Sequence, residues 1–563
     1  MNIKPLLATA TLLMLVGARV SAARVRAVSL RAAACAIAGL FAVGVGAAED
    51  FTLVAPGTCA RVLVGADEPG YVFRAAQDFT NDVKKITGVD LALTRGTTPR
   101  PGDVFIATRR EGAPRTFAGR PGPHSTWEAY DVTVKSGTLT VAGSDARGTM
   151  FGLYDFIERY LKVDPLAFWN GVPYPKADKL AWDAVEIHQP SPTFKFRGWF
   201  INDEDFLSQW REPAGPRPVR TAKHLCSVVI NHGTMEAIAE AMVRSRFNLI
   251  IPCSYIDPRV DYEAENLAIC ARRGLFLSQH HHDPLGLGGF MFLNHWEAKG
   301  RDYKYSYFSH PREVEDMWRE AARAYAKFPD VVWQIGFRGI SDSPMWEADK
   351  SVPTSDVARA QIISDAMAKQ VEILKAIGVE RPYLTATLWG EGAVFNEKGL
   401  LKVPDGATVV YSDNSSGWWW PKDFYETPQD AQHTYGIYYH HQLITAGPHF
   451  VPGVSAARTL MSRASAAERD LAFDAFVYPV TFMHAFTCGM AEFADAFDLY
   501  ALGDTSGAAS AAQRGLAALE SAEALDARYC RGKWIDWHKC RVQVPFPKII
   551  EQARALVTDL ATR

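Results

Sequence analysis

The sequence predicts an α/β protein, in which a (β/α)8 TIM barrel follows a small α/β domain and precedes a short helical region. From Phe194 onward, short apolar runs alternate with helical stretches, a rhythm typical of parallel strands joined by helices. Several of these runs end in ionisable residues, and the catalytic groups of such barrels gather at the carboxyl ends of the strands. A chain of 563 residues has room for about two to four domains.

The N-terminal segment carries the features of a secretory signal. Two apolar runs, Leu6–Val16 and Ala32–Val45, are separated by a segment that carries Arg24, Arg26 and Arg31, and the small residues Gly46–Ala48 follow the second run. A basic segment, a short apolar stretch and a small-residue exit are typical of a signal peptide, and neither run has the length of a stable membrane span. We therefore expect residues 1–48 to be a signal or targeting segment, and the protein to be periplasmic or secreted.

Composition narrows the choice of partners. Apolar residues make up 48% and charged residues 22% of the chain, with a formal net charge of -3; this favours neither nucleic acid nor a membrane surface as partner. The chain holds 15 Trp, 20 Tyr and 30 Phe, a load typical either of a large aromatic core or of a protein whose rings stack on sugars. We expect a polysaccharide or oligosaccharide substrate and no cofactor, and leave a homodimer open.

The cysteines after the signal segment form no close pair typical of zinc sites. Cys530 and Cys540 could bridge in an oxidising compartment. We favour buried free thiols instead, because a large core needs no covalent staple.

Residues 49–190 are expected to form the small α/β domain. Helical spacing of apolar residues predicts helices at Tyr71–Ile86 and Thr149–Tyr160. The expected strands are Phe51–Val54, Ala60–Val64, Asp103–Ala107, Tyr130–Val134 and Thr138–Val141. A proline-rich link, Val172–Pro192, ends the domain.

Residues 191–490 are expected to form the catalytic barrel, and residues 491–563 a helical region. The eight expected barrel strands are Phe194–Ile201, Leu249–Cys253, Leu275–Ser278, Val331–Ile335, Tyr383–Leu388, Val409–Tyr411, Gly436–Tyr439 and Phe476–Val480. Helices are expected between them, including Met235–Ser245, Tyr262–Arg272, Glu313–Phe328 and Ser355–Ile377. In the last region, Ala508–Asp526 and Ile549–Thr562 are expected to be helical.

Ionisable and aromatic residues follow seven of the expected strands. The candidate site residues, in strand order, are Asp203, Glu204, His281, Asp283, Arg338, Asp342, Glu391, Asp413, Asn414, Trp418 and His440. Glycoside hydrolysis needs two carboxylates across a pocket, one to protonate the leaving oxygen and one to activate water or attack carbon. Arginine adds a planar fork that matches a substrate carboxylate.

Each candidate also has a structural alternative. Asp203–Asp205 could cap a helix, Arg338 and Asp342 could form an ion pair without catalytic role, and Trp418–Trp420 could be either a core cluster or a sugar platform. His280–His282 suggest a metal site, but neighbours along a strand point to opposite faces, so we expect that the three cannot converge. We expect no metal, and keep a metal-dependent hydrolase using His280 and His282 as a minor alternative.

Seven segments resemble glycoside hydrolase family 115, the xylan α-1,2-glucuronidases. They are Gly143–Tyr154, Asp164–Trp169 with Val172 and Pro173, Arg197–Glu204, Gly336–Asp342, Gly399–Pro404, Tyr411–Asn414 and Gly436–His440. The resemblance implies an inverting, exo-acting hydrolase that removes glucuronic or 4-O-methyl-glucuronic acid from xylan. It implies that Glu391 is the general acid and Asp342 the base, with Arg338 and Asn414 near the uronate.

The chain departs from the family pattern at several positions. Asp283 stands where the family usually has Glu, and Ser412 replaces an acidic residue before Asp413 and Asn414. Val477–Thr481 stands in place of an Asn-Val-Gly-Asp stretch, and the family's C-terminal β-domain is not expected. Two alternatives therefore stay open: a non-catalytic carbohydrate-binding relative, and a hydrolase of a different α-linked sugar. The acid and base could also be exchanged.

Overall fold

The computed structural model describes residues 50–109, 127–202, 207, 210, 215–216, 228–413, 420–440, 450–466, 468–535 and 546–562. The predicted targeting segment 1–48 lies outside them. Across the described helices, none combines the length and the apolar character that crossing a bilayer requires.

The N-terminal part is built on a six-stranded mixed sheet with the order β4-β3-β5-β7-β6-β9. The strands are β3 (Val62–Val64), β4 (Leu93–Arg95), β5 (Val104–Ile106), β6 (Tyr130–Lys135), β7 (Thr138–Gly143) and β9 (Glu186–Gln189). β3 pairs in parallel with β4 and β5, whereas β6 pairs antiparallel with β7 and β9. A smaller antiparallel sheet joins β1 (Phe51–Ala55) to β2 (Thr58–Cys59) and β8 (Leu180–Trp182).

Both predicted helices of this part are present. α2 spans Gly70–Thr87, and its buried residues, among them Val72, Phe79 and Val83, recur at helical spacing. α3 (Ala146–Phe156) begins where Asp145 accepts a hydrogen bond from the Gly148 N–H at 2.7 Å, a typical N-cap.

The second part carries seven parallel strands in chain order, β10-β13-β14-β15-β16-β17-β18. They are β10 (Gly198–Phe200), β13 (Leu249–Ile251), β14 (Phe276–Ser278), β15 (Val331–Gln334), β16 (Tyr383–Leu388), β17 (Thr408–Ser412) and β18 (Thr434–Tyr438). All six neighbouring pairs are parallel. The sheet curls as a half-barrel, so parallel strands at the predicted positions are confirmed, whereas a closed eight-stranded barrel is not found among the described strands.

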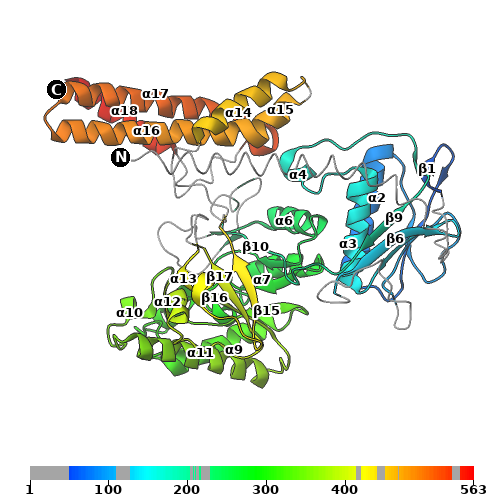
Figure 1. Ribbon diagram of the computed structural model, residues 1–563, viewed down its shortest axis with the longest axis horizontal. Coiled ribbons are helices and arrows are strands. Elements are labelled where there is room, and N and C mark those ends of the chain that lie inside the picture. Colours follow the sequence, from blue (N-terminus) through cyan, green and yellow to red (C-terminus); the bar gives the residue numbers. More distant parts are fainter. Residues whose placement is uncertain are drawn as a thin grey trace, which may run out of the picture. The chain divides into compact units, whose positions relative to one another are not determined.

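Helices follow most of these strands and cover the outside of the sheet (Figure 1). They are α6 (His232–Arg244), α7 (Asp261–Arg272), α8 (Gly289–Ala298), α9 (Pro311–Tyr325), α11 (Asp356–Ala376), α12 (Glu391–Glu397) and α13 (Lys422–Glu426). α9 shows why: Val314, Met317, Trp318 and Tyr325 are buried on one face, which is the spacing of an amphipathic helix.

The predicted eighth strand, Phe476–Val480, is wrong. These residues lie in the π-helical turn η4 (Phe473–Val477) and the start of α16 (Tyr478–Ala501). A short apolar run cannot be distinguished from a buried helical segment by its pattern alone, and Pro479 is tolerated because it stands in the first turn of α16.

The C-terminal part consists of helices, among which α16, α17 (Thr505–Tyr529) and α18 (Phe546–Thr562) run side by side (Figure 1). α16 and α17 approach closely at two glycines: a Cβ added at Gly489 would lie 2.8 Å from Leu519, and one at Gly515 would lie 2.9 Å from Phe493. Residues 490 and 491, the predicted end of the barrel part, lie inside α16.

Candidate active site

The site begins where β15 ends. The Gly336 N–H donates to Gln370 Oε1 at 2.8 Å, and Gln370 Nε2 donates to the Gly336 carbonyl at 2.6 Å. Gln370 comes from α11 and is completely buried. Because one amide satisfies both backbone groups of Gly336, it fixes the direction in which the chain leaves the sheet toward Arg338.

Arg338 joins the two carboxylates that the sequence selects as catalytic. Its Nη1 donates to Asp342 Oδ1 at 2.8 Å and its Nη2 to the Asp342 carbonyl at 2.6 Å. Its Nε lies 3.2 Å from Glu391 Oε1 and 3.3 Å from Oε2. The predicted pair of acids is therefore gathered around one guanidinium, and the ion pair considered as a structural alternative for Arg338 and Asp342 is present.

Glu391 reaches Arg338 from the first turn of α12, directly after β16 and Trp389. Gly390 before it has φ 57° and ψ -114°, a backbone conformation that only glycine adopts readily. A Cβ at this position would lie 3.0 Å from Arg338 Nη2. Glycine therefore allows both the turn into α12 and the close approach of the guanidinium.

The two carboxyl groups have opposite electrostatic environments. The Glu391 side chain is 11% exposed, whereas that of Asp342 is 73% exposed. Burial raises the pKa of Glu391 above its usual value, against the opposing effect of Arg338. A hydrogen bond from His282, with the nearby Arg338 charge, lowers the pKa of Asp342 to about 2. Glu391 is thus the more readily protonated of the two.

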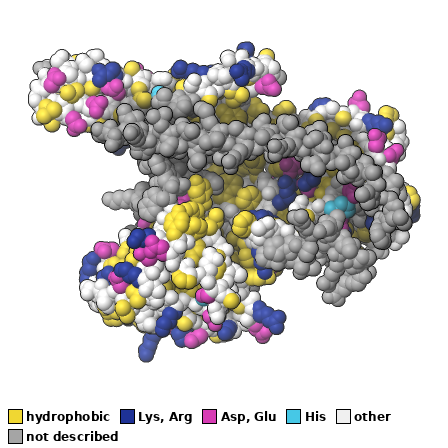
Figure 2. Space-filling view, in the orientation of Figure 1, with side chains coloured by type: hydrophobic (Ala, Val, Ile, Leu, Met, Phe, Trp, Pro, Cys, Tyr) yellow, Lys and Arg dark blue, Asp and Glu magenta, His cyan; other side chains and the backbone are white. Residues whose placement is uncertain are grey.

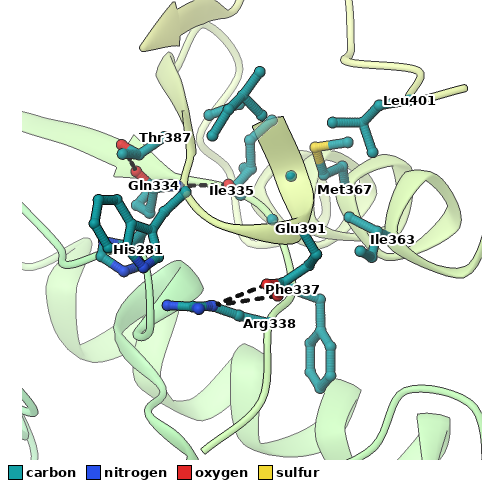
Figure 3. A pocket seen from close by; sticks show the side chains of 15 residues that line it. His281, Gln334, Ile335, Phe337, Arg338, Ile363, Met367, Thr387, Glu391 and Leu401 are labelled. Carbon is teal, nitrogen blue, oxygen red and sulfur yellow. Dashed lines mark hydrogen bonds and ion pairs between the residues drawn. The ribbon is translucent and has the colours of Figure 1, made fainter. Parts of the chain in front are cut away.

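A small cavity opens beside Glu391 (Figure 3). It is lined mainly by residues at the ends of β15 and β16, among them Gln334, Arg338, Trp389 and Glu391, and also by His281 from the segment after β14. Its volume is about 40 Å³, which is enough for one water molecule. Asp342 lies outside the lining and is linked to the cavity through Arg338.

The expectation that His280, His281 and His282 cannot converge is wrong. Their ring centroids lie 4.0 to 4.2 Å apart. β14 ends at Ser278, and the Asp283 N–H donates to the His280 carbonyl at 2.8 Å in a turn. The alternation of side chains along a strand therefore does not apply to this segment.

The three imidazoles offer nitrogen atoms within 4.8 Å of one another, which raises the question of a metal. Both nitrogens of His282 already have partners, Tyr255 Oη at 3.2 Å from Nδ1 and Asp342 Oδ1 at 3.1 Å from Nε2. Arg338 Nη1 lies 3.3 Å from the same Nε2 and would repel a cation. His282 is therefore engaged in hydrogen bonds, whereas His280 Nδ1 and His281 Nε2 are buried and have no hydrogen-bond partner among the described residues.

Asp283 and Asp413 are both buried. Asp283 Oδ2 accepts the Tyr255 N–H at 2.9 Å, and Asp283 is not among the residues lining the cavity.

Asp413 Oδ2 accepts the His440 N–H at 2.9 Å, and its Oδ1 contacts His440 Nδ1. The ring of His440 lies 5.4 Å from that of Trp389. The Asp413–His440 pair thus supports Trp389, while a substrate contact for these residues stays a prediction.

Four predicted site residues, Asp203, Glu204, Asn414 and Trp418, lie outside the described residues. The neighbouring Trp420 packs on Phe424, with ring centroids 4.7 Å apart. Hydrophobic side chains are exposed in this part of the molecule (Figure 2): Tyr425 on α13 is 67% exposed, and Tyr439, directly after β18, is 43% exposed.

Trp389, Gln370, Tyr255 and His282 belong to the site but are not among the candidate site residues that the sequence predicts. Trp389 could have been found, because it directly follows the β16 run and precedes Glu391. Gln370 left no signal, because it lies on the buried face of a helix remote in sequence from Gly336.

Part of the chain matches a known protein family, and its fold is similar to solved structures. Residues 189–468 match the family model described as glycosyl hydrolase family 115. No curated protein sequence matches the chain. Among solved structures, the chain is similar to the family GH115 4-O-methyl-alpha-glucuronidase BtGH115A, with 16% identity and a TM-score of 0.64 over 88% of this chain and 80% of that one. A GH138 enzyme targeting pectin rhamnogalacturonan II matches with 10% identity and a TM-score of 0.41, over 89% of this chain and 74% of that one.

The likeness to BtGH115A supports the fold, and the family match covers the strands that carry Arg338, Asp342 and Glu391. Through residues 189–468, the chain belongs to glycosyl hydrolase family 115, and it is a glycoside hydrolase.

Proposed function

We propose that the protein is an inverting, exo-acting α-glucuronidase that removes an α-linked glucuronic or 4-O-methyl-glucuronic acid from xylan or a related polysaccharide. The observation that carries this proposal is the pair of unlike carboxyl groups on Arg338: Glu391 is buried with a raised pKa, and Asp342 is exposed with a pKa of about 2.

The electrostatics favour Glu391 as the general acid. A general acid must hold a proton at the working pH, and burial helps Glu391 to do so. A general base must be ionised, as Asp342 is above pH of about 2. With the roles exchanged, Asp342 would have to be protonated at a pH where Glu391 is ionised, and the opposite directions of the two pKa shifts disfavour that combination.

Asp342 and Glu391 bind the same guanidinium, at 2.8 Å from Nη1 and 3.2 Å from Nε, so both carboxyl groups can act on one substrate. Inverting glycosidases separate their acid and base by about 6.5–9.5 Å, which leaves room for a water molecule. Retaining enzymes use about 5 Å, and the configuration of the product distinguishes the two.

The substrate would sit above the cavity. A volume of about 40 Å³ is far below the several hundred Å³ of ordinary ligand pockets, so the sugar must bind at the mouth, where Asp342 is exposed. Arg338 supplies the cation for a uronate. BtGH115A is described as specific for decorated arabinogalactans, which adds these to xylan as candidate polymers and keeps a different α-linked sugar as the alternative. We also propose export to the periplasm or the medium, from the features of residues 1–48.

The test is a screen for uronic acid released from glucuronoxylan, decorated arabinogalactan and defined α-uronosyl oligosaccharides, with NMR of the first-formed anomer. We expect β-uronic acid first, and at least about a 10³-fold loss of turnover in Glu391→Gln and in Asp342→Asn. Glu397→Gln, at the far end of α12, is the control and should retain activity. Near-normal turnover in both site variants, or tight sugar binding without any product, would refute the proposal.

A further inference from the structure

We propose that Tyr255 and His282 form a hydrogen-bonded relay that orients Asp342 and fixes which of its oxygens takes the proton from water. In this relay the Tyr255 hydroxyl donates to His282 Nδ1 at 3.2 Å, and His282 Nε2–H donates to Asp342 Oδ1 at 3.1 Å. The inference rests on the proposed function, since it names the positioning residues behind the proposed base.

The direction of the relay follows from counting donors. An ionised carboxylate only accepts hydrogen bonds, and a neutral imidazole has one donor and one acceptor nitrogen. Because the acceptor Asp342 Oδ1 lies nearer to His282 Nε2, at 3.1 Å, than the donor Arg338 Nη1 does, at 3.3 Å, we place the proton on Nε2, which leaves Nδ1 as the acceptor. The Tyr255 hydroxyl donates to Nδ1. Without this hydroxyl, the proton of His282 would no longer be confined to Nε2 and could move to Nδ1.

Asp342 Oδ1 receives two donors, His282 Nε2 at 3.1 Å and Arg338 Nη1 at 2.8 Å. Among the described residues, no hydrogen bond is found to Oδ2. Since Oδ1 is held from two sides, Oδ2 is the oxygen left to accept a proton from the attacking water. A carboxylate held in this way presents one defined oxygen to the reaction.

Tyr255 is held in place at a conformational cost. Its φ is 55°, in the left-handed region that is unfavourable for a bulky residue and that recurs at functional sites. Asp283 Oδ2 accepts its N–H at 2.9 Å, and the Tyr255 ring packs edge-on against Phe290, with centroids 5.1 Å apart. The buried Asp283 therefore acts indirectly: it holds the backbone of Tyr255, whose hydroxyl contacts His282.

The charges around His282 agree with a neutral donor. His280 and His281 lie beside it on its own segment, Tyr255 faces it from the loop after β13, and Arg338 and Asp342 face it from the loop after β15. Glu391 on α12 is reached only through Arg338. Burial, with the Arg338 charge, lowers the pKa of His282, against the opposing effect of Asp342, so the imidazole is neutral at neutral pH.

The experiment compares Tyr255→Phe with Tyr305→Phe, a variant that also removes a buried hydroxyl, in this case one bonded to the Leu287 carbonyl at 3.1 Å. We expect Tyr255→Phe to lower kcat by about tenfold or more and to leave KM within about threefold. The acidic limb of the pH profile should move upward, because a proton that leaves His282 Nε2 for Nδ1 no longer binds Asp342. Tyr305→Phe should leave kcat and the pH profile unchanged. Equal profiles for the two variants would overturn the relay.

A second variant tests whether Tyr255 acts through His282. The amide nitrogen of His282→Gln can replace the Nε2–H donor, so this variant should retain more activity than His282→Leu. In the His282→Gln background, Tyr255→Phe should have little further effect on the pH profile, because the partner of the hydroxyl is gone. A full effect of Tyr255→Phe in that background would contradict the relay.

A readout without substrate separates this inference from the proposed function. In protein labelled with ¹⁵N-histidine, with the His282 signals assigned by their loss in His282→Gln, NMR should show the proton on Nε2 in the native chain and a shift toward Nδ1 in Tyr255→Phe. A proton on Nδ1 in the native chain overturns the relay even if the enzyme is active. The expected tautomers with no uronic acid released would refute the proposed function and leave the relay standing.

Discussion

Gly390→Ala is the substitution that tests most simply how the site is built. Gly390 has φ 57° and ψ -114°, and strain of this kind costs about 1–3 kcal/mol for a residue with a side chain. The stiffer unfolded chain returns about 0.4–1 kcal/mol. We therefore expect a net loss of about 1–2 kcal/mol in the free energy of unfolding.

The same substitution should also disturb Arg338. The new Cβ would lie 3.0 Å from Nη2 and 3.6 Å from Cζ, so the guanidinium must shift by a few tenths of an ångström. Its bonds to Asp342, at 2.6 and 2.8 Å, would lengthen. Because small displacements of positioned groups reduce rates steeply, we expect kcat/KM to fall by about tenfold or more.

Gly392→Ala is the matched control two residues away. A Cβ there meets nothing closer than Leu388 at 3.7 Å, and alanine in a helix is favoured over glycine by about 0.5–1 kcal/mol. Urea unfolding followed by far-UV circular dichroism should place the midpoint of Gly390→Ala below, and that of Gly392→Ala at or above, that of the parent. Equal stability and activity of the two variants would refute this reasoning about the turn.

Three further predictions follow from the contacts of the site. The kcat/KM should fall as pH rises through the raised pKa of Glu391, because the acid loses its proton, and should stay level on the acidic side toward the Asp342 pKa of about 2; an acidic limb near pH 4–5, the range of an ordinary carboxyl, would contradict the assignment. Excess EDTA should leave turnover unchanged, and a loss that zinc restores would show a metal at the histidines. Gln370→Leu leaves both backbone groups of Gly336 without a hydrogen bond, which costs about 1–3 kcal/mol for each buried group. Its unfolding midpoint should therefore fall well below that of Gln361→Leu, a control at an exposed position of the same helix, where Gln361 bonds Asp365. Equal midpoints would contradict the role of Gln370 in holding Gly336.

The positions of the strands that carry the site could be predicted from the sequence. The apolar runs Val331–Ile335 and Tyr383–Leu388 gave β15 and β16 almost to the residue, because such runs buried in a parallel sheet are read directly from composition. Asp342 and Glu391, which follow these strands, meet at the Arg338 guanidinium, as expected for groups beyond the carboxyl ends of neighbouring parallel strands.

The predictions that failed concern features that the local sequence pattern does not determine. Phe476–Val480 reads equally well as strand or buried helix, and packing of α16 against α17 decides for helix. His280–His282 lie beyond Ser278, where both the predicted and the observed strand end, so the alternation of side chains along a strand does not apply to them. Gln370 acts through a contact between α11 and the end of β15, which no local pattern encodes.

Azide rescue measures the assigned roles most directly. With an activated α-uronoside as substrate, Asp342→Ala should regain turnover in azide and release a β-uronosyl azide, since azide replaces the water that Asp342 would activate. Glu391→Ala should keep much of its rate on this substrate, whose leaving group needs no proton, and should gain nothing from azide. Rescue of Glu391→Ala with formation of the azide product, and none of Asp342→Ala, would contradict the account.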